Sequence, residues 1–297
     1  MNSYLEANAR ERLQHLVDAG SLEEWLPPSA RVSSPHLAQL DAPVAFDDGV
    51  VIGRARIVGR NVFVAAQEGG FMGGAVGEVH GAKLVGLLQR AIQDRPEAVL
   101  LLLETGGVRL HEANAGLIAV SEVMRAVLAA RAAGIPVIVL VGGANGCFGG
   151  MGIVARCANA VIMSEEGRLA MSGPEVIETA SGVEEFDARD RALIWRTSGG
   201  KHRYLLGDCH AIVADRIDAF RQAALDALDW LPGAVELSLA ALEAEHAMLA
   251  ARLNDFGALR DPLDIWRALG VPEPAAVPML EIAPFVDLVA SHRVHPA

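Results

Sequence analysis

Cysteine is scarce in this sequence: Cys147, Cys157 and Cys209 are the three present among 297 residues. They form no CxxC pair, the spacing that ribbon-type zinc sites use, and three thiols do not make a disulfide framework. The sequence therefore indicates neither a zinc ribbon nor a disulfide-stapled fold. We expect no bound metal.

Aromatic side chains, basic charge and long apolar runs are also lacking. Only 5% of the residues are aromatic although 52% are hydrophobic, and the net charge is −12. An acidic chain is a poor candidate for nucleic-acid binding. No apolar run approaches the roughly 18 to 20 residues that span a bilayer, and the charged N-terminus is unlike a signal peptide. We therefore expect a cytoplasmic protein that binds neither nucleic acid nor membrane.

One basic stretch departs from this acidic balance. Residues 189–204 hold four arginines and a lysine, namely Arg189, Arg191, Arg196, Lys201 and Arg203. The stretch is either a solvated helix face or a docking patch for an anionic cofactor tail or an acidic partner.

Alternating strands and helices dominate the first two thirds of the chain. The patterns predict a helix near 7–19, a strand pair at 50–67, helices at 78–93, 112–133 and 151–157, and strands at 98–104, 136–141 and 159–167. In the helix at 112–133, apolar residues repeat at helical spacing: Leu117, Val120, Met124, Val127 and Leu128. Such a βαβ order predicts parallel strands with right-handed crossovers. We expect one α/β domain over 1–297, with an N-terminal helical segment at 1–30 and a mainly helical part at 215–297 that ends in a docking tail.

Two of the predicted parallel strands end in paired glycines followed by a helix. Gly106-Gly107 follows the strand at 98–104, and Gly149-Gly150 precedes the helix at 151–157. A backbone N–H that approaches a ligand oxygen needs a residue without a Cβ, and two such groups aimed at one oxygen form an oxyanion hole. The alternative is that these glycines only allow tight turns.

Nucleotide-binding motifs are weak or absent. Residues 150–155 match GxGxxA, but a dinucleotide fingerprint should follow its strand directly, and here the strand ends near Val141. No GxxxxGK[ST], GxSxG or HExxH motif occurs. The remaining catalytic inventory consists mainly of backbone amides.

Four motifs in order resemble one enzyme family. "GGFMGGAVGEVHGAKL", "ETGGVRLHEA", "GGANGCFGGMG" and "RLAMSGPEVIE" are similar to the motifs of carboxyltransferase β subunits of acyl-CoA carboxylases over residues 40–215. Within that family, the N-terminal segment and "WRTSGGKHRYLLGD" resemble β subunits of biotin-independent malonate decarboxylases. The chain departs from the family in lacking its zinc ribbon and in having Thr105-Gly106-Gly107-Val108-Arg109 where the family has SGGAR.

The resemblance implies a crotonase/ClpP-like fold, a superhelix of repeated ββα turns. It also implies a heteromer with a carboxyltransferase-like γ (α-type) subunit and an acyl-carrier subunit, whose phosphopantetheine-type (dephospho-CoA-derived) arm carries the substrate. No cofactor is then bound directly. By the same resemblance, Gly106, Gly107, Gly149 and Gly150 are the catalytic candidates, and Gly73, Gly74, Gly143 and Arg109 are the substrate-binding candidates.

Charged side chains around the first glycine pair leave alternatives open. Arg109 steadies a substrate carboxylate or bridges the loop structurally. His111 is a candidate proton donor, because imidazole titrates near neutrality, and Glu112 fits a first-turn helix carboxylate. His80 and Lys83 contact cofactor phosphates or form a solvated pair. Cys147 is a nucleophile or a buried thiol.

We expect malonyl-thioester decarboxylation through an enolate held by backbone donors. The alternatives are a biotin-dependent carboxyltransferase β subunit, a non-catalytic scaffold and, least favoured, an NAD-binding protein.

Overall fold

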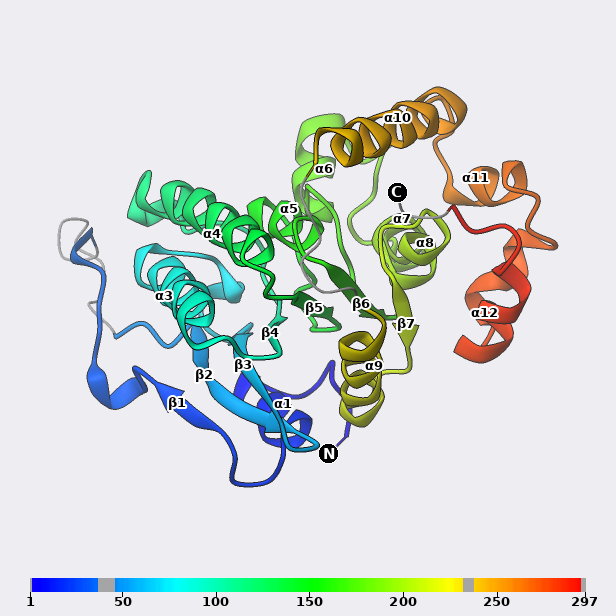
Figure 1. Cartoon of the computed structure of the whole chain (residues 1–297). Coiled ribbons are helices and arrows are strands. Elements are labelled where there is room, and N and C mark those ends of the chain that lie inside the picture. Colours follow the sequence, from blue (N-terminus) through cyan, green and yellow to red (C-terminus); the bar gives the residue numbers. More distant parts are fainter. Residues whose placement is uncertain (1, 37–45, 232–237, 295–297) are drawn as a thin grey trace.

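The computed structural model describes residues 2–36, 46–231 and 238–294. A seven-stranded sheet runs through the centre of the molecule, with its strands in sequence order from β1 to β7 (Figure 1). The strands are β1 (Glu23–Trp25), β2 (Val50–Ile57), β3 (Arg60–Gln67), β4 (Ala98–Leu102), β5 (Val137–Val141), β6 (Ala160–Ser164) and β7 (Ala211–Val213). The first three pair antiparallel and the rest parallel.

Helices cover both faces of this sheet. On one face lie α3 (Glu78–Asp94), α4 (Ala115–Ala132) and α5 (Gly150–Arg156), and on the other α1 (Ala9–Leu16) and α9 (Ile217–Trp230) (Figure 1). Because successive strand residues point to opposite faces, neighbours in β4 join different cores. Val99 and Leu101 pack toward α3 and α4, whereas Leu100 and Leu102 pack toward α1 and α9.

The predicted strands and helices of this region are confirmed, with small shifts at their ends. The strand pair turns at Val58 and Gly59, both with positive φ, as hairpin turns require. Helix α1 starts later than expected because the Asn8 side chain caps its start in a capping box with Glu11. The predicted helical segment at 1–30 is wrong beyond α1, because it also contains strand β1 and a 3-10 helix at Pro28–Ala30. Helix α4 starts only at Ala115, after a 3-10 turn at Leu110–Glu112.

The apolar stripe of α4 is displaced from its predicted position. Val120, Val123 and Val127 are buried, but Leu117 is 58% exposed and Leu128 36%. A helix buries a broad arc of its surface against the core. The spacing of apolar residues along the sequence therefore does not determine which residues at the edges of that arc are buried.

A second, shorter ladder crosses the carboxyl ends of the parallel strands. It consists of single parallel bridges, Val76 to Val108, Thr105 to Cys147 and Cys147 to Leu169. Each turn of the chain thus gives one strand to the large sheet, one bridge residue to the small ladder, and then a helix. This repeat is the expected crotonase-like ββα superhelix.

The C-terminal third is mainly helical, as predicted, apart from β7. Its elements are α10 (Leu239–Phe256), α11 (Pro262–Ala268), a 3-10 helix at Pro274–Met279 and α12 (Ile282–Val289); the expected start of α10 at 234–237 lies outside the described residues. The predicted docking tail contains α12, whose Phe285 and Val289 pack in one buried cluster with Leu205 and Trp266 of this same chain. Strand β7 was not predicted, because its three residues are too few to show the alternating pattern of a strand. Among the helices of the described ranges, none is long and apolar enough to cross a membrane.

Candidate active site

The two glycine loops meet at the carboxyl edge of the sheet. Phe148 N–H donates to Thr105 O at 3.0 Å, which ties the second loop to the first. A Cβ placed on Gly149 would lie 3.4 Å from the Cα of Gly107. The glycine pairs after β4 and β5 are therefore in contact, and their backbone groups share one region.

Two of the four predicted catalytic N–H groups are already occupied. Gly106 N–H donates to Gly73 O at 2.9 Å, and Gly149 N–H donates to Met171 O at 2.9 Å. A donor bound to a backbone carbonyl is not available to a substrate oxygen. The structure thus gives the amides of Gly106 and Gly149 a structural role, contrary to the expectation from the sequence.

The other two remain candidate donors. Gly107 N–H contacts only the hydroxyl of Thr105, at 3.1 Å, and Gly150 N–H has no acceptor within the described part of the chain. Val108 N–H is likewise without an acceptor among these residues. No sequence signal singles out Val108, because every residue type except proline offers the same backbone donor.

Two of the glycines predicted to bind substrate, Gly74 and Gly143, make room for Glu104. A Cβ on Gly74, whose φ is +70°, would overlap the Glu104 carbonyl oxygen, and one on Gly143 would overlap the Glu104 carboxylate. Gly73 gives its carbonyl to Gly106, as described above. The structure therefore supports a packing role for Gly74 and Gly143. A Cβ on Gly73 would meet nothing within 4 Å, so the substrate contact of Gly73 stays a prediction.

Glu104 is the centre of a buried polar network that the sequence did not reveal. Its carboxylate pairs with Arg12 of α1 and accepts Asn145 N–H at 3.1 Å. Its own N–H donates to the Gln67 side chain at 2.9 Å. Glu104 and Arg12 are 4% and 1% exposed. The network joins α1, the end of β4 and the second glycine loop.

Arg109 lies beneath the first glycine loop and is not a substrate-binding residue in this structure. Its guanidinium pairs with Asp47 and, at 3.0 Å, with Glu112, and its Nε donates to Ala75 O at 2.9 Å. Its side chain is 2% exposed. Of the two alternatives for Arg109, the geometry supports the structural bridge.

Glu112 stabilises a different helix from the one expected. Its carboxylate accepts Glu78 N–H, at the start of α3, at 2.6 Å, and it is fully buried. The negative charge thus lies at the amino end of α3, where free N–H groups favour it. His111, between Arg109 and Glu112, is half-buried, and the structure leaves its predicted role as proton donor untested.

His80 and Lys83 are buried, which contradicts both readings made from the sequence. They are 0% and 5% exposed and lie on the inner face of α3. Lys83 Nζ donates to the carbonyls of Asp47 and Val50, each at 3.3 Å. Gln67 uses its Oε1 on Glu104 N–H, so its amide nitrogen donates to His80 Nε2 at 3.0 Å. This places the His80 proton on Nδ1.

Burial of His80 predicts an acid-sensitive stability. Burial lowers the pKa of His80 to about 3, although the charge of Asp47 opposes the shift. Between pH 6.5 and about 3, only the unfolded state binds this proton, so the free energy of unfolding falls as the pH falls. His80 contributes about 1.4 kcal/mol per pH unit in that window.

Urea denaturation at pH 7, 6, 5 and 4 tests this expectation. His80→Gln should show a shallower loss of the free energy of unfolding toward acid than the wild-type chain. His36→Gln, at a half-buried histidine paired with Glu78, is the control. Parallel pH profiles for the wild type and His80→Gln would contradict the assignment.

Two other candidates are set aside by burial and pairing. Burial raises the pKa of the Cys147 thiol to about 12, which supports the buried-thiol reading. Within the basic stretch, Lys201 pairs with Glu165 and Arg203 with Asp208, while Arg196 faces Asp261 at 3.3 Å. These three cations are paired with carboxylates outside the stretch, whereas Arg189 and Arg191 are exposed, so the solvated-face alternative describes only those two arginines.

The GxGxxA match also has a packing explanation. A Cβ on Gly150 would overlap Val120 of α4, and one on Gly152 would approach Ala170 O at 2.7 Å. Eight residues separate the end of β5 at Val141 from α5, so the helix does not follow its strand directly. Over residues 2–36, 46–231 and 238–294, no group of three or more His, Cys, Asp or Glu side chains is arranged to hold a metal.

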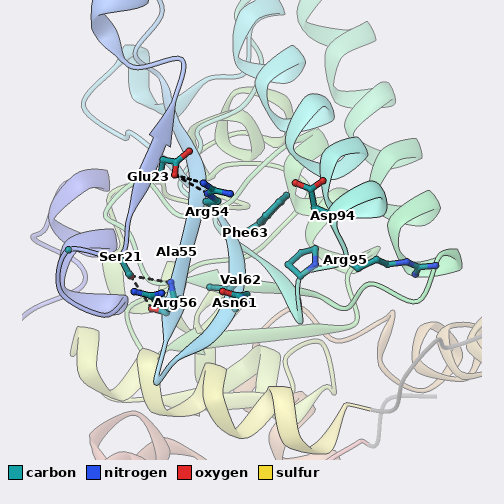
Figure 2. A pocket seen from close by; sticks show the side chains of 12 residues that line it. Ser21, Glu23, Arg54, Ala55, Arg56, Asn61, Val62, Phe63, Asp94 and Arg95 are labelled. Atoms are coloured by element: carbon teal, nitrogen blue, oxygen red, sulfur yellow. Dashed lines mark hydrogen bonds and ion pairs between the residues drawn. The ribbon is translucent and has the colours of Figure 1, made fainter.

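A groove of about 580 Å³ lies at the opposite end of the parallel strands (Figure 2). Figure 2 shows the Arg54 guanidinium directed at Glu23, to which it donates at 2.7 Å, and Ser21 bonded to the backbone of Arg56. Its walls include Asn61, at the start of β3, and Pro96, just before β4. The groove is therefore remote from the glycine loops, and its ionic groups are largely satisfied.

Exposed apolar side chains surround the glycine loops. Leu110, next to Arg109, is 90% exposed, and the set further includes Met72, Leu117, Ile118 and Met171. Met171 is the residue whose carbonyl binds Gly149. Exposed apolar side chains gathered at one place mark an interaction surface.

The chain is similar to known proteins in sequence and in fold. Residues 6–245 match the carboxyl transferase domain. The chain is 47% identical over 234 residues to malonyl-S-ACP:biotin-protein carboxyltransferase MADC of Malonomonas rubra, covering 74% of this chain and 73% of that protein. It is 31% identical over 185 residues to the acetyl-coenzyme A carboxylase carboxyl transferase subunit beta of Fusobacterium nucleatum, covering 60% of each.

Solved structures agree. A chain of a Pseudomonas malonate decarboxylase hetero-tetramer, crystallised in complex with malonate, matches with a TM-score of 0.81 at 38% identity, covering 90% of this chain and 97% of that one. The resemblance predicted from the four motifs, and the fold that it implied, are thereby confirmed. The chain belongs to the carboxyl transferase domain family.

Proposed function

We propose that this chain is the β-type subunit of a malonate decarboxylase, which converts a malonyl thioester into an acetyl thioester and CO₂. The observation that carries the proposal is the contact between two glycine loops with unoccupied N–H groups, in a chain similar to a Pseudomonas malonate decarboxylase subunit. The carboxyltransferase of Malonomonas rubra that it resembles is also named for malonyl-S-ACP.

The chemistry needs donors for one developing charge. When the bond between the methylene and carboxylate carbons breaks, its electrons move into the thioester carbonyl and form an enolate, and CO₂ leaves. Gly107 or Val108 from the first loop, with Gly150 from the second, then donate to the enolate oxygen. A proton added to the methylene carbon completes the acetyl thioester, and His111 stays our candidate donor.

A second chain completes this site in our proposal. The apolar side chains around Leu110 leave the glycine loops without a cover in the described residues, which fits a carboxyltransferase-like γ subunit docking there. The substrate arrives on the phosphopantetheine-type (dephospho-CoA-derived) arm of an acyl-carrier subunit, which is long and narrow enough for a site between chains. Three free cysteines fit a reducing, cytoplasmic location.

A biotin-dependent carboxyltransferase is the second candidate function. The 47% identical relative carries biotin-protein in its name, and the same oxyanion site would serve CO₂ transfer to a biotin carrier. The two functions differ in whether CO₂ is released without biotin.

The test is CO₂ release from a malonyl thioester by this chain, alone and with its partner subunit, with and without avidin. We expect release that needs both chains and that avidin does not inhibit. Release blocked by avidin would assign the biotin-dependent reaction instead. No release under any of these conditions would favour a scaffold role.

A further inference from the structure

Arg168 lies against the second glycine loop without being part of it. It follows β6, and its carbonyl accepts Cys147 N–H at 2.7 Å. The Arg168 guanidinium donates to Ala144 O. A Cβ on Gly146 would lie 3.1 Å from the Cβ of Arg168. The side chain is thus placed by the loop that ends in Gly149-Gly150.

Two aromatic rings flank its charge. The guanidinium carbon is 5.7 Å from the ring centroid of Phe148 and 5.8 Å from that of Trp195. Phe148 directly precedes the glycine pair, and Trp195 lines a cavity of about 320 Å³ beside Glu165 and Lys201. Such contacts hold a cation in place without neutralising it.

Unlike four other cations near the carboxyl edge of the sheet, Arg168 has no carboxylate partner among the described residues. Near the carboxyl edge of the sheet, the paired cations and their partners are Arg12 with Glu104, Arg109 with Asp47, Lys201 with Glu165 and Arg203 with Asp208. Among the described residues, no carboxylate oxygen lies within 4.0 Å of Arg168. Glu175, Glu104 and Arg191 are the charged groups that face it at longer range.

Burial lowers the pKa of Arg168, and the distant Glu175 and Glu104 only partly oppose this. An arginine stays charged in a protein, so the half-buried guanidinium remains a cation that has lost part of its hydration. An incoming anion would restore that lost stabilisation through charge-assisted hydrogen bonds, which arginine forms with both carboxylate and phosphate.

We propose that Arg168 binds an anionic group of the acyl-thioester substrate at the mouth of the second glycine loop. The group is a carboxylate or a phosphate: the free carboxylate of the malonyl group or the phosphate of its carrier arm. The inference rests on the proposed function, since it names the residue that selects the substrate of that site. Arg168 thereby takes the anion-binding role that the sequence suggested for Arg109.

The test uses the assembled enzyme with Arg168→Gln and Arg168→Lys, and two substrates. Malonyl-N-acetylcysteamine carries the carboxylate without a phosphate, whereas malonyl-phosphopantetheine carries both. We expect Arg168→Gln to raise KM by about 10- to 100-fold with a much smaller change in kcat, because a ground-state contact is lost. Arg168→Lys, which keeps the charge, should recover part of the affinity.

The two substrates identify the source of the anion. A KM increase of equal size with both assigns the carboxylate, and an increase confined to malonyl-phosphopantetheine assigns the phosphate. Arg189→Gln, at a side chain 85% exposed on the same stretch of chain as Trp195, is the matched control and should leave both constants unchanged.

An unchanged KM for both substrates in Arg168→Gln would overturn the inference, as would a fall in kcat alone that Arg168→Lys does not repair. If the wild-type complex releases no CO₂ from either substrate, the proposed function fails by itself. In that case, calorimetric titration with malonyl-phosphopantetheine still decides the inference: binding to the wild type that Arg168→Gln weakens at least 10-fold supports it, and equal binding or none overturns it.

Discussion

Replacing Gly150 with proline is expected to lower kcat about 100- to 1000-fold, the usual loss when one oxyanion donor is removed. Gly150 is the first residue of α5, and its N–H has no acceptor within the described residues. Proline is well tolerated at that helix position, so the substitution removes the donor while keeping the helix. The loss should appear in kcat, because the interaction forms as charge develops on the substrate oxygen.

The control for this substitution is Gly150→Ala in the same background. A Cβ at this position would overlap Val120, so both variants are made with Val120→Ala to provide space. Alanine keeps the N–H and proline does not, which isolates the donor from the steric effect. Equal turnover by the two variants, with equal thermal stability, would remove Gly150 from the catalytic assignment.

Arg109→Met is expected to lower the free energy of unfolding by about 3 to 5 kcal/mol, the cost of leaving a buried carboxylate without its partner. Arg109 and Asp47 have side chains 2% and 3% exposed. Burial opposes ionisation of Asp47, but the hydrogen bonds and charge of Arg109 outweigh it and hold the pKa of Asp47 below its usual value. Removing Arg109 leaves this carboxylate, together with Glu112, uncompensated.

Chemical denaturation of the variants measures this cost. Asp47→Asn combined with Arg109→Met should be less destabilised than the sum of the two single variants, because the second change removes the unpaired charge. Arg125→Met is the control, since Arg125 is 60% exposed and its pair with Glu122 contributes little. A destabilisation below about 1 kcal/mol for Arg109→Met would show that Arg109 does not hold the loop.

Much of the fold was accessible from the sequence because its signals are local. The apolar runs of β4 and β5, the helical period of α4 and the hairpin turn at Gly59 each depend on neighbours a few residues away. The glycine pairs are also a local signal, because they mark positions where a side chain would prevent close approach to the backbone. The missed strands β1 and β7 are the exceptions, because each has only three residues and therefore no readable period.

The candidate site could be predicted from the sequence only in part. The two glycine loops that form it were identified from the sequence, and the four motifs indicated the family. The sequence did not reveal which N–H groups and side chains of the site are available to a substrate, because their hydrogen-bond partners are distant in the sequence. The sequence predicted a substrate donor at Gly106, but its N–H donates to Gly73 O. Both interpretations of His80 required an exposed side chain, but the packing of α3 buries it.

By itself, then, the sequence determined the βα order, the two glycine loops, the family and the kind of chemistry they serve. Only the tertiary structure decided which arginines have a carboxylate partner. Arg109 is bound to Asp47, 62 residues away, and Arg12 to Glu104, 92 residues away, whereas Arg168 has aromatic neighbours and no carboxylate among the described residues. The physical reason is that the charge of an arginine is a property of the residue, but its pairing is a property of the folded chain.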